Sequence, residues 1–378
     1  MSRPWYLTRG GPGQDQGWAV AVDSRGDIYF GTHQQPERAP FADMVVYKLG
    51  PDGTELWQAR WGGRFMEKTF VVTATDRFVY VGGLTYRSAN LTDADMVVLA
   101  LDADNGELAW EFTWGQGFGY EEVDGLAVDG DYLYVSGWTT GNDSGNDLAL
   151  LKLDKSGRLV WVQTWGGKGW DEADGQLVVR ADSVYVAGRY GGKNMLLGGK
   201  GLVARFSKDT GELRTHETWG EPLFTDALGM TADAAYLYVV GLTLDKGKGG
   251  QIFLRKYDPG LRLLWEQVWG GSKSESARAV TVDGSGDVLV AGESDGEGGE
   301  GLDIVLLRYT ADGDLIGART WGGPEHDGAL GIAHRGGDIY IAGKTASFGE
   351  GQDEAILLHV VGPDGRFPEM GPGGAPEG

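Results

Sequence analysis

The sequence predicts an all-β protein, a seven-bladed β-propeller made of four-stranded antiparallel blades. The first observation is the phrase W-x-x-T-W-G-G, or a variant of it, which recurs with its second tryptophan at Trp61, Trp114, Trp165, Trp219, Trp269 and Trp321. The steps between these tryptophans are 53, 51, 54, 50 and 52 residues. A period of this size indicates an array of supersecondary units. The second observation is that short β-favouring runs and glycine turns fill each period and leave no room for a helix.

A seventh copy of the phrase stands at the N-terminus, from Trp5 to Gly11, with Arg9 in place of the second tryptophan. The last unit instead breaks up after Gly365 into Arg366-Phe367-Pro368, and proline removes a donor from a strand ladder. We therefore expect strand 4–9 to complete the last blade and close the ring, which removes exposed sheet edges. The expected domain is one propeller over residues 1–370, with blades ending near 61, 114, 165, 219, 269, 321 and ~370, followed by a flexible Gly/Pro tail over 371–378.

Residues 121–167 illustrate one blade. Its expected strands are 125–129, 131–137, 147–153 and 159–165, and an aromatic residue returns in the second strand of most blades. The two tryptophans of the fourth strand are four residues apart, so they point to the same face of the sheet. We interpret them as wedges between neighbouring blades; the alternative is an aromatic platform for a sugar or a cofactor ring. The Gly-Gly that follows allows a sharp turn into the next blade.

Composition restricts the function classes. The formal net charge of -22 argues against nucleic acid or an anionic membrane surface as a partner, and it fits a soluble monomer. The chain has no cysteine, which excludes disulfides and thiolate metal sites. No run of 18 apolar residues predicts a membrane span. No secretory signal is recognised before the first expected strand, and the compartment stays open.

Loop length indicates which side of the propeller carries a site. The connections between strands one and two and between strands three and four are tight turns, such as Pro51-Asp52-Gly53. The connections between strands two and three are longer and differ from blade to blade. Because binding sites concentrate on variable loops held by a rigid scaffold, we expect the site on this second side, at the mouth of the central channel.

Three sets of residues are expected on that side. An acidic residue precedes the inner strand of most blades: Asp15, Glu121, Asp171, Glu275 and Asp327, with Asp226 shifted by one. An aspartate opens the third strand: Asp43, Asp95, Asp147, Asp303 and Asp353. The position after the second strand changes from blade to blade: His33, Leu84, Trp138, Arg189, Leu242, Glu293 and Lys344.

The repeating acids predict side chains that accept backbone N–H bonds in turns. The alternative is a ring of carboxylates that binds calcium or a cationic ligand. The variable set has no task common to all blades, so we expect it to set ligand specificity. The candidate ligand-binding residues are His33, Trp138, Arg189, Glu293, Lys344, Asp15, Glu121, Asp171, Glu275 and Asp327.

Metal and catalytic signals are few. The loop from Asp295 to Asp303 carries Asp295, Glu297, Glu300 and Asp303, whose oxygens suit calcium; no cofactor other than calcium is a candidate from the residues alone. Ring closure would bring His33 towards His326, which suits a divalent metal or a general base. The chain has no nucleophile elbow, zinc-protease helix motif or P-loop.

The blade pattern resembles the bacterial and archaeal seven-bladed propeller repeats called SBBP repeats. The matching segments are Ala127-Val128-Asp129, Tyr134-Val135-Ser136-Gly137, 147–153 and 159–167, and the likeness covers residues 5–365. The fourth blade departs from the pattern, with Arg180 and Thr215 in place of the aspartate and the first tryptophan. The resemblance implies an extracellular or cell-envelope protein. A second resemblance, to quinoprotein repeats, lies in 101–110 and 208–213 and implies a calcium–quinone pair.

The leading hypothesis from the sequence is a non-catalytic binding or scaffold propeller that presents its loop-rich side to a protein or glycan partner. The alternative is an enzyme at the mouth of the channel, either a metal-assisted lyase or hydrolase or a quinone-dependent dehydrogenase.

Overall fold

The computed structural model describes residues 3–11, 13–37, 39–117, 119–141, 145–194, 197–220, 223–244, 248–295, 301–349, 353–362 and 364–370. The expected tail, 371–378, lies outside them. The chain divides into two compact units. Unit 1 comprises Met1–Val81, Leu99–Ala109 and Thr281–Gly378, and unit 2 comprises Gly82–Val98 and Trp110–Val280.

The prediction of an all-β chain is confirmed, because the described residues form strands and turns and no helix. It follows that this part of the chain offers no helix that could cross a membrane. The strands of the first two sheets, β2-β3-β4-β5 and β6-β7-β8-β9, are β2 (Gln16–Val22), β3 (Ile28–Gln34), β4 (Asp43–Leu49), β5 (Glu55–Trp61), β6 (Glu67–Ala74), β7 (Phe78–Tyr86), β8 (Ala94–Asp102) and β9 (Leu108–Trp114).

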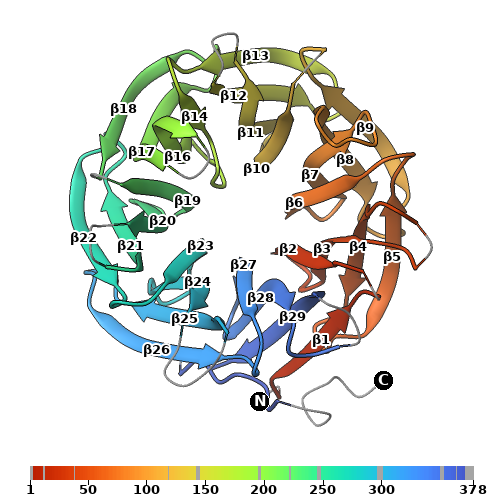
Figure 1. Ribbon diagram of the computed structural model, residues 1–378, viewed down its shortest axis with the longest axis vertical. Helices are drawn as coiled ribbons and strands as arrows, with labels where there is room; N and C mark the ends of the chain where they lie inside the picture. Colours follow the sequence, from red (N-terminus) through yellow and green to blue (C-terminus); the bar gives the residue numbers. More distant parts are fainter. Residues whose placement is uncertain are drawn as a thin grey trace. The chain divides into compact units, whose positions relative to one another are not determined.

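Unit 2 continues with one nine-stranded sheet and the sheet β19-β20-β21-β22. Its strands are β10 (Glu121–Asp129), β11 (Tyr132–Thr140), β12 (Asn146–Asp154), β13 (Leu159–Trp165), β14 (Trp170–Glu172), β15 (Val178–Arg180), β16 (Ser183–Asn194), β17 (Leu197–Ser207), β18 (Leu213–Trp219), β19 (Phe224–Ala232), β20 (Leu237–Leu244), β21 (Gly250–Tyr257) and β22 (Leu263–Trp269). The nine strands are two sets of antiparallel strands joined by one parallel pair, Asn146 with Trp170. Within this unit, Figure 1 shows β13, β18 and β22 along the outer side and β10 and β19 on the inner side.

The remaining sheets are β23-β24-β25-β26 and β1-β29-β28-β27. Their strands are β23 (Glu275–Val282), β24 (Val288–Ser294), β25 (Asp303–Tyr309), β26 (Leu315–Trp321), β27 (Asp327–Arg335), β28 (Asp338–Thr345), β29 (Glu354–Val361) and β1 (Trp5–Arg9). In the last sheet the N-terminal strand β1 pairs antiparallel with β29, in a register that sets Trp5 opposite His359 and Arg9 opposite Ala355.

The first tryptophan of the outer strand packs on a turn of the following repeat in three of the repeats, as the wedge interpretation predicted. Trp110 lies against Gly157, where an added methyl group would come within 2.7 Å of its ring, and its Nε1 donates to the Lys155 carbonyl at 3.0 Å. The same contact of tryptophan with a turn glycine recurs at Trp57 with Gly106 and at Trp161 with Gly211. Each of these glycines has a positive φ, so the turn conformation and the ring contact both require glycine.

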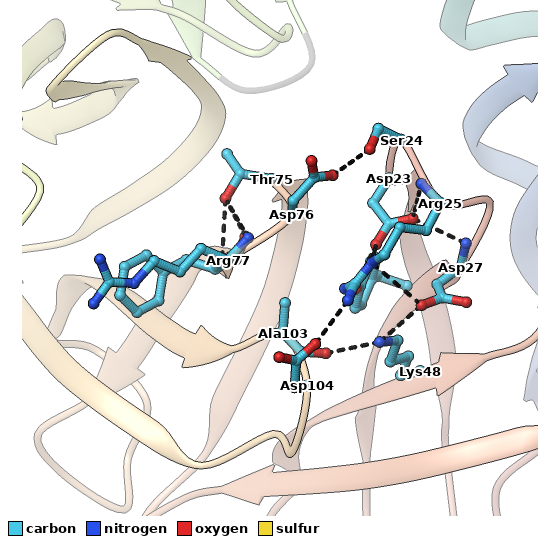
Figure 2. A network of polar contacts seen from close by, with 12 residues as sticks. Asp23, Ser24, Arg25, Asp27, Lys48, Thr75, Asp76, Arg77, Ala103 and Asp104 are labelled. Atoms are coloured by element: carbon cyan, nitrogen blue, oxygen red, sulfur yellow. Dashed lines mark hydrogen bonds and ion pairs between the residues drawn. The ribbon is translucent and has the colours of Figure 1, made fainter.

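Polar contacts tie the short-turn side of the first two sheets together (Figure 2). Asp23 accepts the N–H groups of Arg25 and Asp27 at 2.9 and 3.0 Å, which fixes the turn between β2 and β3. Buried Lys48 donates to the Ala103 carbonyl at 2.9 Å and pairs with Asp27 at 2.8 Å. This side of the sheets therefore has a structural task.

Candidate functional site

The first set of repeating acids caps backbone N–H groups. Asp15 accepts the N–H of Gly11 and the N–H of Gln35, each at 2.7 Å, and so ties the loop before β2 to the end of β3. Other members of the set make equivalent bonds to the loop after the second tryptophan: Asp171 to Gly167, Glu275 to Gly271 and Asp327 to Gly323. The contacts fit turn capping, and a ligand role for these four residues stays a prediction.

The second set packs on the glycine that follows the second tryptophan. A methyl group added to Gly62 would lie 2.1 Å from Oδ1 of Asp43. The same juxtaposition occurs at Gly115 with Asp95, Gly166 with Asp147 and Gly322 with Asp303. These aspartates and glycines therefore shape the same turn. Of the expected calcium ligands, Glu297 and Glu300 lie outside the described residues, while Asp295 and Asp303 flank that gap.

The variable set lies directly opposite a second variable position. In the antiparallel registers, five of its seven members face the residue that follows the position of the repeating acid: Gln16 with His33, Glu122 with Trp138, Glu172 with Arg189, Asp226 with Leu242, and Gly328 with Lys344. This inner position was not predicted from the sequence. A pattern in the sequence could have predicted it: the residue immediately after each repeating acid changes in charge from one repeat to the next.

The register also corrects the reading of Asp226 as a shifted member of the repeating acids. Thr225 pairs with Thr243, as Glu121 pairs with Thr139 and Asp327 with Thr345. Thr225 thus occupies the position of the repeating acid. Asp226 belongs with Glu122 and Glu172 at the inner variable position.

Glycines let the inner strands of unit 2 approach one another closely. A methyl group on Gly125 would come within 2.9 Å of the Leu177 nitrogen, and one on Gly229 within 2.4 Å of the Arg278 carbonyl oxygen. The register of β10 shifts between Val123 and Gly125, so Asp124 is the extra residue of a bulge. Bulges re-aim side chains, and here the close approach brings acids from separate inner segments together.

The result is a carboxylate cluster that consists of Glu122, Asp124, Glu172, Asp174 and Asp226. Burial raises the pKa of Asp124, Asp174 and Asp226, and their neighbours' negative charges raise the pKa values of Asp124 and Asp174 further. After burial itself, the negative charge of Asp226 has the largest effect on Asp174, so these two carboxyls repel each other. Burial and the charge of Asp174 raise the pKa of Glu172 to about 7.

One buried cation lies in the cluster. The Arg189 side chain is 2% exposed; its guanidinium pairs with Glu172 and lies 5.2 Å from the centre of the Phe224 ring. Asn146 also donates to Glu172. Even so, within the described residues Oδ2 of Asp124, Oδ2 of Asp174 and Oδ1 of Asp226 accept no hydrogen bond. Asp226 is only 5% exposed, so the cluster retains acceptor capacity at a buried carboxylate.

An aromatic pair borders the cluster. The ring of Tyr120 stacks on that of Trp138 with 4.8 Å between centroids and 12° between planes. Burial and the negative charge of Glu122 raise the pKa of Tyr120. Aromatic rings and carboxylates are groups that interact favourably with an organic cation, and a ligand role for Trp138 stays a prediction.

The other candidates lie in unit 1. Burial and the charge of Lys68 lower the pKa of His33 to about 3, so the ring is neutral; His326 instead accepts the N–H of Leu302 at 3.1 Å. Glu293 and Lys344 both approach Gly328, since a methyl group there would lie 2.7 Å from Glu293 Oε2 and 3.3 Å from Lys344 Cε. No three His, Cys, Asp or Glu side chains in the described part of the chain are arranged to hold a metal ion.

Glu121, which lies next to Glu122 of the cluster in the sequence, predicts that the stability of the protein depends on pH. Burial raises the pKa of Glu121 to about 7, against a smaller opposing effect of its bond from Thr139. Because the folded-state pKa lies above the unfolded value, the stabilisation is complete below about pH 4.5 and is lost as the pH rises through 7. We expect Glu121→Gln to flatten the fall in melting temperature between about pH 4.5 and pH 7. The exposed variant Glu111→Gln is the control, and an unchanged slope in Glu121→Gln would contradict the prediction.

Comparisons with known proteins identify the fold. A family model described as outer membrane protein assembly factor BamB matches residues 94–339, more than half of the chain. No curated protein sequence matches the chain. Among solved structures, the chain is similar to quinohemoprotein alcohol dehydrogenase from Comamonas testosteroni, with 13% identity, 98% of this chain and 78% of that chain covered, and a TM-score of 0.54.

Two further structures are similar at 10% identity. The Neurospora crassa Pan2 WD40 domain has a TM-score of 0.55, with 96% of this chain and 97% of that chain covered. Drosophila Plexin A in complex with Semaphorin 1b has a TM-score of 0.54, with 95% and 88% covered. At these identities the likeness shows the fold alone, and the fold is a β-propeller. The expected SBBP repeat family is not among the families that these matches show.

Proposed function

The chain belongs to the family described as outer membrane protein assembly factor BamB, and from that premise we propose that it is a non-catalytic binding propeller. The proposed architecture is seven blades of the SBBP type over residues 1–370, closed by β1. The pairing of β1 with β29 and the regular spacing of the tryptophans support it. We place the protein in the cell envelope, in line with the description of the family.

The proposed partner is a protein that offers a basic side chain. The observation that carries this proposal is the carboxylate cluster, in which Asp226 is buried and keeps an oxygen without a hydrogen-bond donor among the described residues. Burying charge of one sign is unfavourable unless an opposite charge neutralises it. Arg189 supplies one such charge, and an ammonium or guanidinium group of a partner would supply another beside the Tyr120–Trp138 pair.

Calorimetric titration with a tetralysine peptide tests the proposal. We expect Asp174→Asn/Asp226→Asn to weaken binding by about tenfold or more, which corresponds to ~1.4 kcal/mol. The raised pKa values of both acids mean that the amides also remove an unfavourable charge, so the variant stays folded.

The matched control is Asp312→Asn/Asp314→Asn, which removes the same charge at two exposed positions. Equal losses in the two double variants would show that the peptide responds only to overall charge. Binding of a neutral tetrasaccharide in place of the peptide would assign the protein to glycans instead.

The residues present do not favour the enzymatic alternative with a calcium–quinone pair. A calcium–quinone pair, which the quinoprotein resemblance implies, needs six or more oxygens around the metal. The described residues contain no three-residue metal group, and the acids of unit 2 engage Arg189 and one another. These residues do not fit the pair, and no catalytic step is derived through it.

A further inference from the structure

In two of the repeats, the outer strand lacks the first tryptophan, which elsewhere contacts a turn of the next repeat. In the usual arrangement, the first tryptophan of the outer strand covers a glycine in the next turn, as Trp161 covers Gly211. In β18 the tryptophan position is Thr215, and in β26 it is Gly317. The turns that face these two positions differ: one carries a large side chain and the other carries glycine.

The missing tryptophan of β18 is compensated within the chain. The turn after β21 carries Leu261 where the other turns carry glycine, and its N–H donates to the Asp258 carbonyl at 3.0 Å, as the N–H of Gly157 donates to the Asp154 carbonyl. Leu261 keeps the left-handed conformation of that position, with φ of 64°, and is 7% exposed. It belongs to the core cluster of Tyr185 and Trp219. A large turn residue therefore accompanies the loss of the tryptophan, at the cost of a strained backbone.

The missing tryptophan of β26 is not compensated. Gly317 faces a turn whose corresponding residue is Gly365, with φ of 61°. A methyl group on Gly365 would approach Leu306 at 3.2 Å and no aromatic ring. Both glycines line a cavity of about 270 Å³. A cavity of ~150 Å³ already holds a benzene ring, so this one accommodates an indole. All its lining residues belong to unit 1.

The lining matches an indole in chemistry as well as in size. Leu289, Leu306 and Ile339 are buried and form an apolar wall. Arg308, which pairs with Asp287 at 2.8 Å, also lines the cavity and offers a guanidinium to a ring face. Ile316 also lines the cavity and is 54% exposed. A free indole would leave this side chain uncovered, whereas an extended polypeptide would cover it.

We propose that the cavity between Gly317 and Gly365 is a binding site for a tryptophan side chain on an extended segment of a partner protein. The incoming ring takes the place that Trp57, Trp110 and Trp161 take within the chain. This inference does not depend on the carboxylate cluster, which consists of unit 2 residues.

Fluorine NMR titrations with 5-fluoroindole and calorimetric titrations with the peptide acetyl-Leu-Ala-Trp-Glu-amide, a copy of residues 108–111, test the proposal. Both probes are expected to bind in a saturable manner, the peptide more tightly. Gly317→Trp is expected to lower both affinities at least tenfold. It should also raise the melting temperature by ~2 °C or more, because it restores buried aromatic area.

Gly365→Leu copies the compensation seen at Leu261 and gives a second means of filling the cavity if Gly317→Trp does not fold. Asp174→Asn/Asp226→Asn should leave both affinities unchanged, which separates this site from the proposed cation site. A second cavity of about 240 Å³ is lined by Ala59, Trp61 and Gly106, and binding there would survive Gly317→Trp. Survival of binding in both filled variants, absence of saturable binding, or binding of 5-fluoroindole without the peptide would each overturn the proposal.

Discussion

Trp161→Ala is expected to lower the free energy of unfolding by about 3 kcal/mol, the lower end of the range for truncating a packed tryptophan. The ring packs against the core cluster that contains Tyr134, Leu150 and Phe206. It also covers Gly211 of the next turn, where a methyl group would lie 2.8 Å from it. The turn glycine cannot follow into the space that alanine leaves, because its hairpin is fixed by backbone bonds from Gly211 to Ser207 at 2.8 Å. Urea unfolding followed by circular dichroism measures the loss.

Val160→Ala is the matched control for this variant. Val160 neighbours Trp161 on the same strand but points to the exposed side, since side chains alternate between the faces of a sheet. Its truncation should change stability by about 0.5 kcal/mol or less. A loss below about 1 kcal/mol in Trp161→Ala would show that the ring is not a wedge between sheets.

Arg189→Met is expected to destabilise unit 2 by about 3–5 kcal/mol, the usual effect of removing one member of a buried ion pair. The variant keeps a side chain of similar length but leaves Glu172 without its guanidinium partner. Asp174 and Asp226, which also face Arg189, lose the positive charge that lowers their pKa values. The loss should therefore be largest above pH 7, where these acids are most ionised.

Two comparisons make this measurement specific. Arg262→Met removes an arginine that pairs with Asp258 at 3.1 Å but whose side chain is 78% exposed, so its effect should stay within about 1 kcal/mol. Adding Glu172→Gln to Arg189→Met should recover part of the stability, because the unpaired charge is removed as well. Equal effects of Arg189→Met and Arg262→Met would contradict the assignment of Arg189 as the neutralising cation of the cluster.

Much of the architecture followed from local patterns. The expected strands of the illustrated repeat, 125–129, 131–137, 147–153 and 159–165, correspond to β10 to β13, except that β10 begins at Glu121 and so includes the acid that was expected before it. The tryptophan spacing predicted side chains on one face of the outer strand, and in β13 both rings contact the next repeat, Trp161 at Gly211 and Trp165 at Tyr190. A closed ring and the role of the variable loops stay predictions.

The candidate site was only half visible in the sequence. The variation of their position between repeats made Trp138 and Arg189 candidates, and both lie at the carboxylate cluster of unit 2, Trp138 against Tyr120 and Arg189 against Glu172. Their partners Glu122 and Glu172 were not predicted, because each follows a repeating acid, and the acidic pattern was assigned to that preceding residue. Asp226 was assigned to the wrong set for the same reason, until the pairing of Thr225 with Thr243 fixed its register.

The sequence by itself determined that the repeating unit is a set of β-strands and that tryptophans lie on its outer strand. These features depend on tryptophans, turn glycines and alternating residues only a few positions apart. They also repeat at a fixed period. Only the tertiary structure decided which acids meet and where a tryptophan is missing without compensation. Asp124, Asp174 and Asp226 lie in different repeats, and their shared charge depends on how closely the glycine-bearing strands approach. The cavity at Gly317 likewise depends on a turn that follows almost fifty residues later, so no local pattern could reveal it.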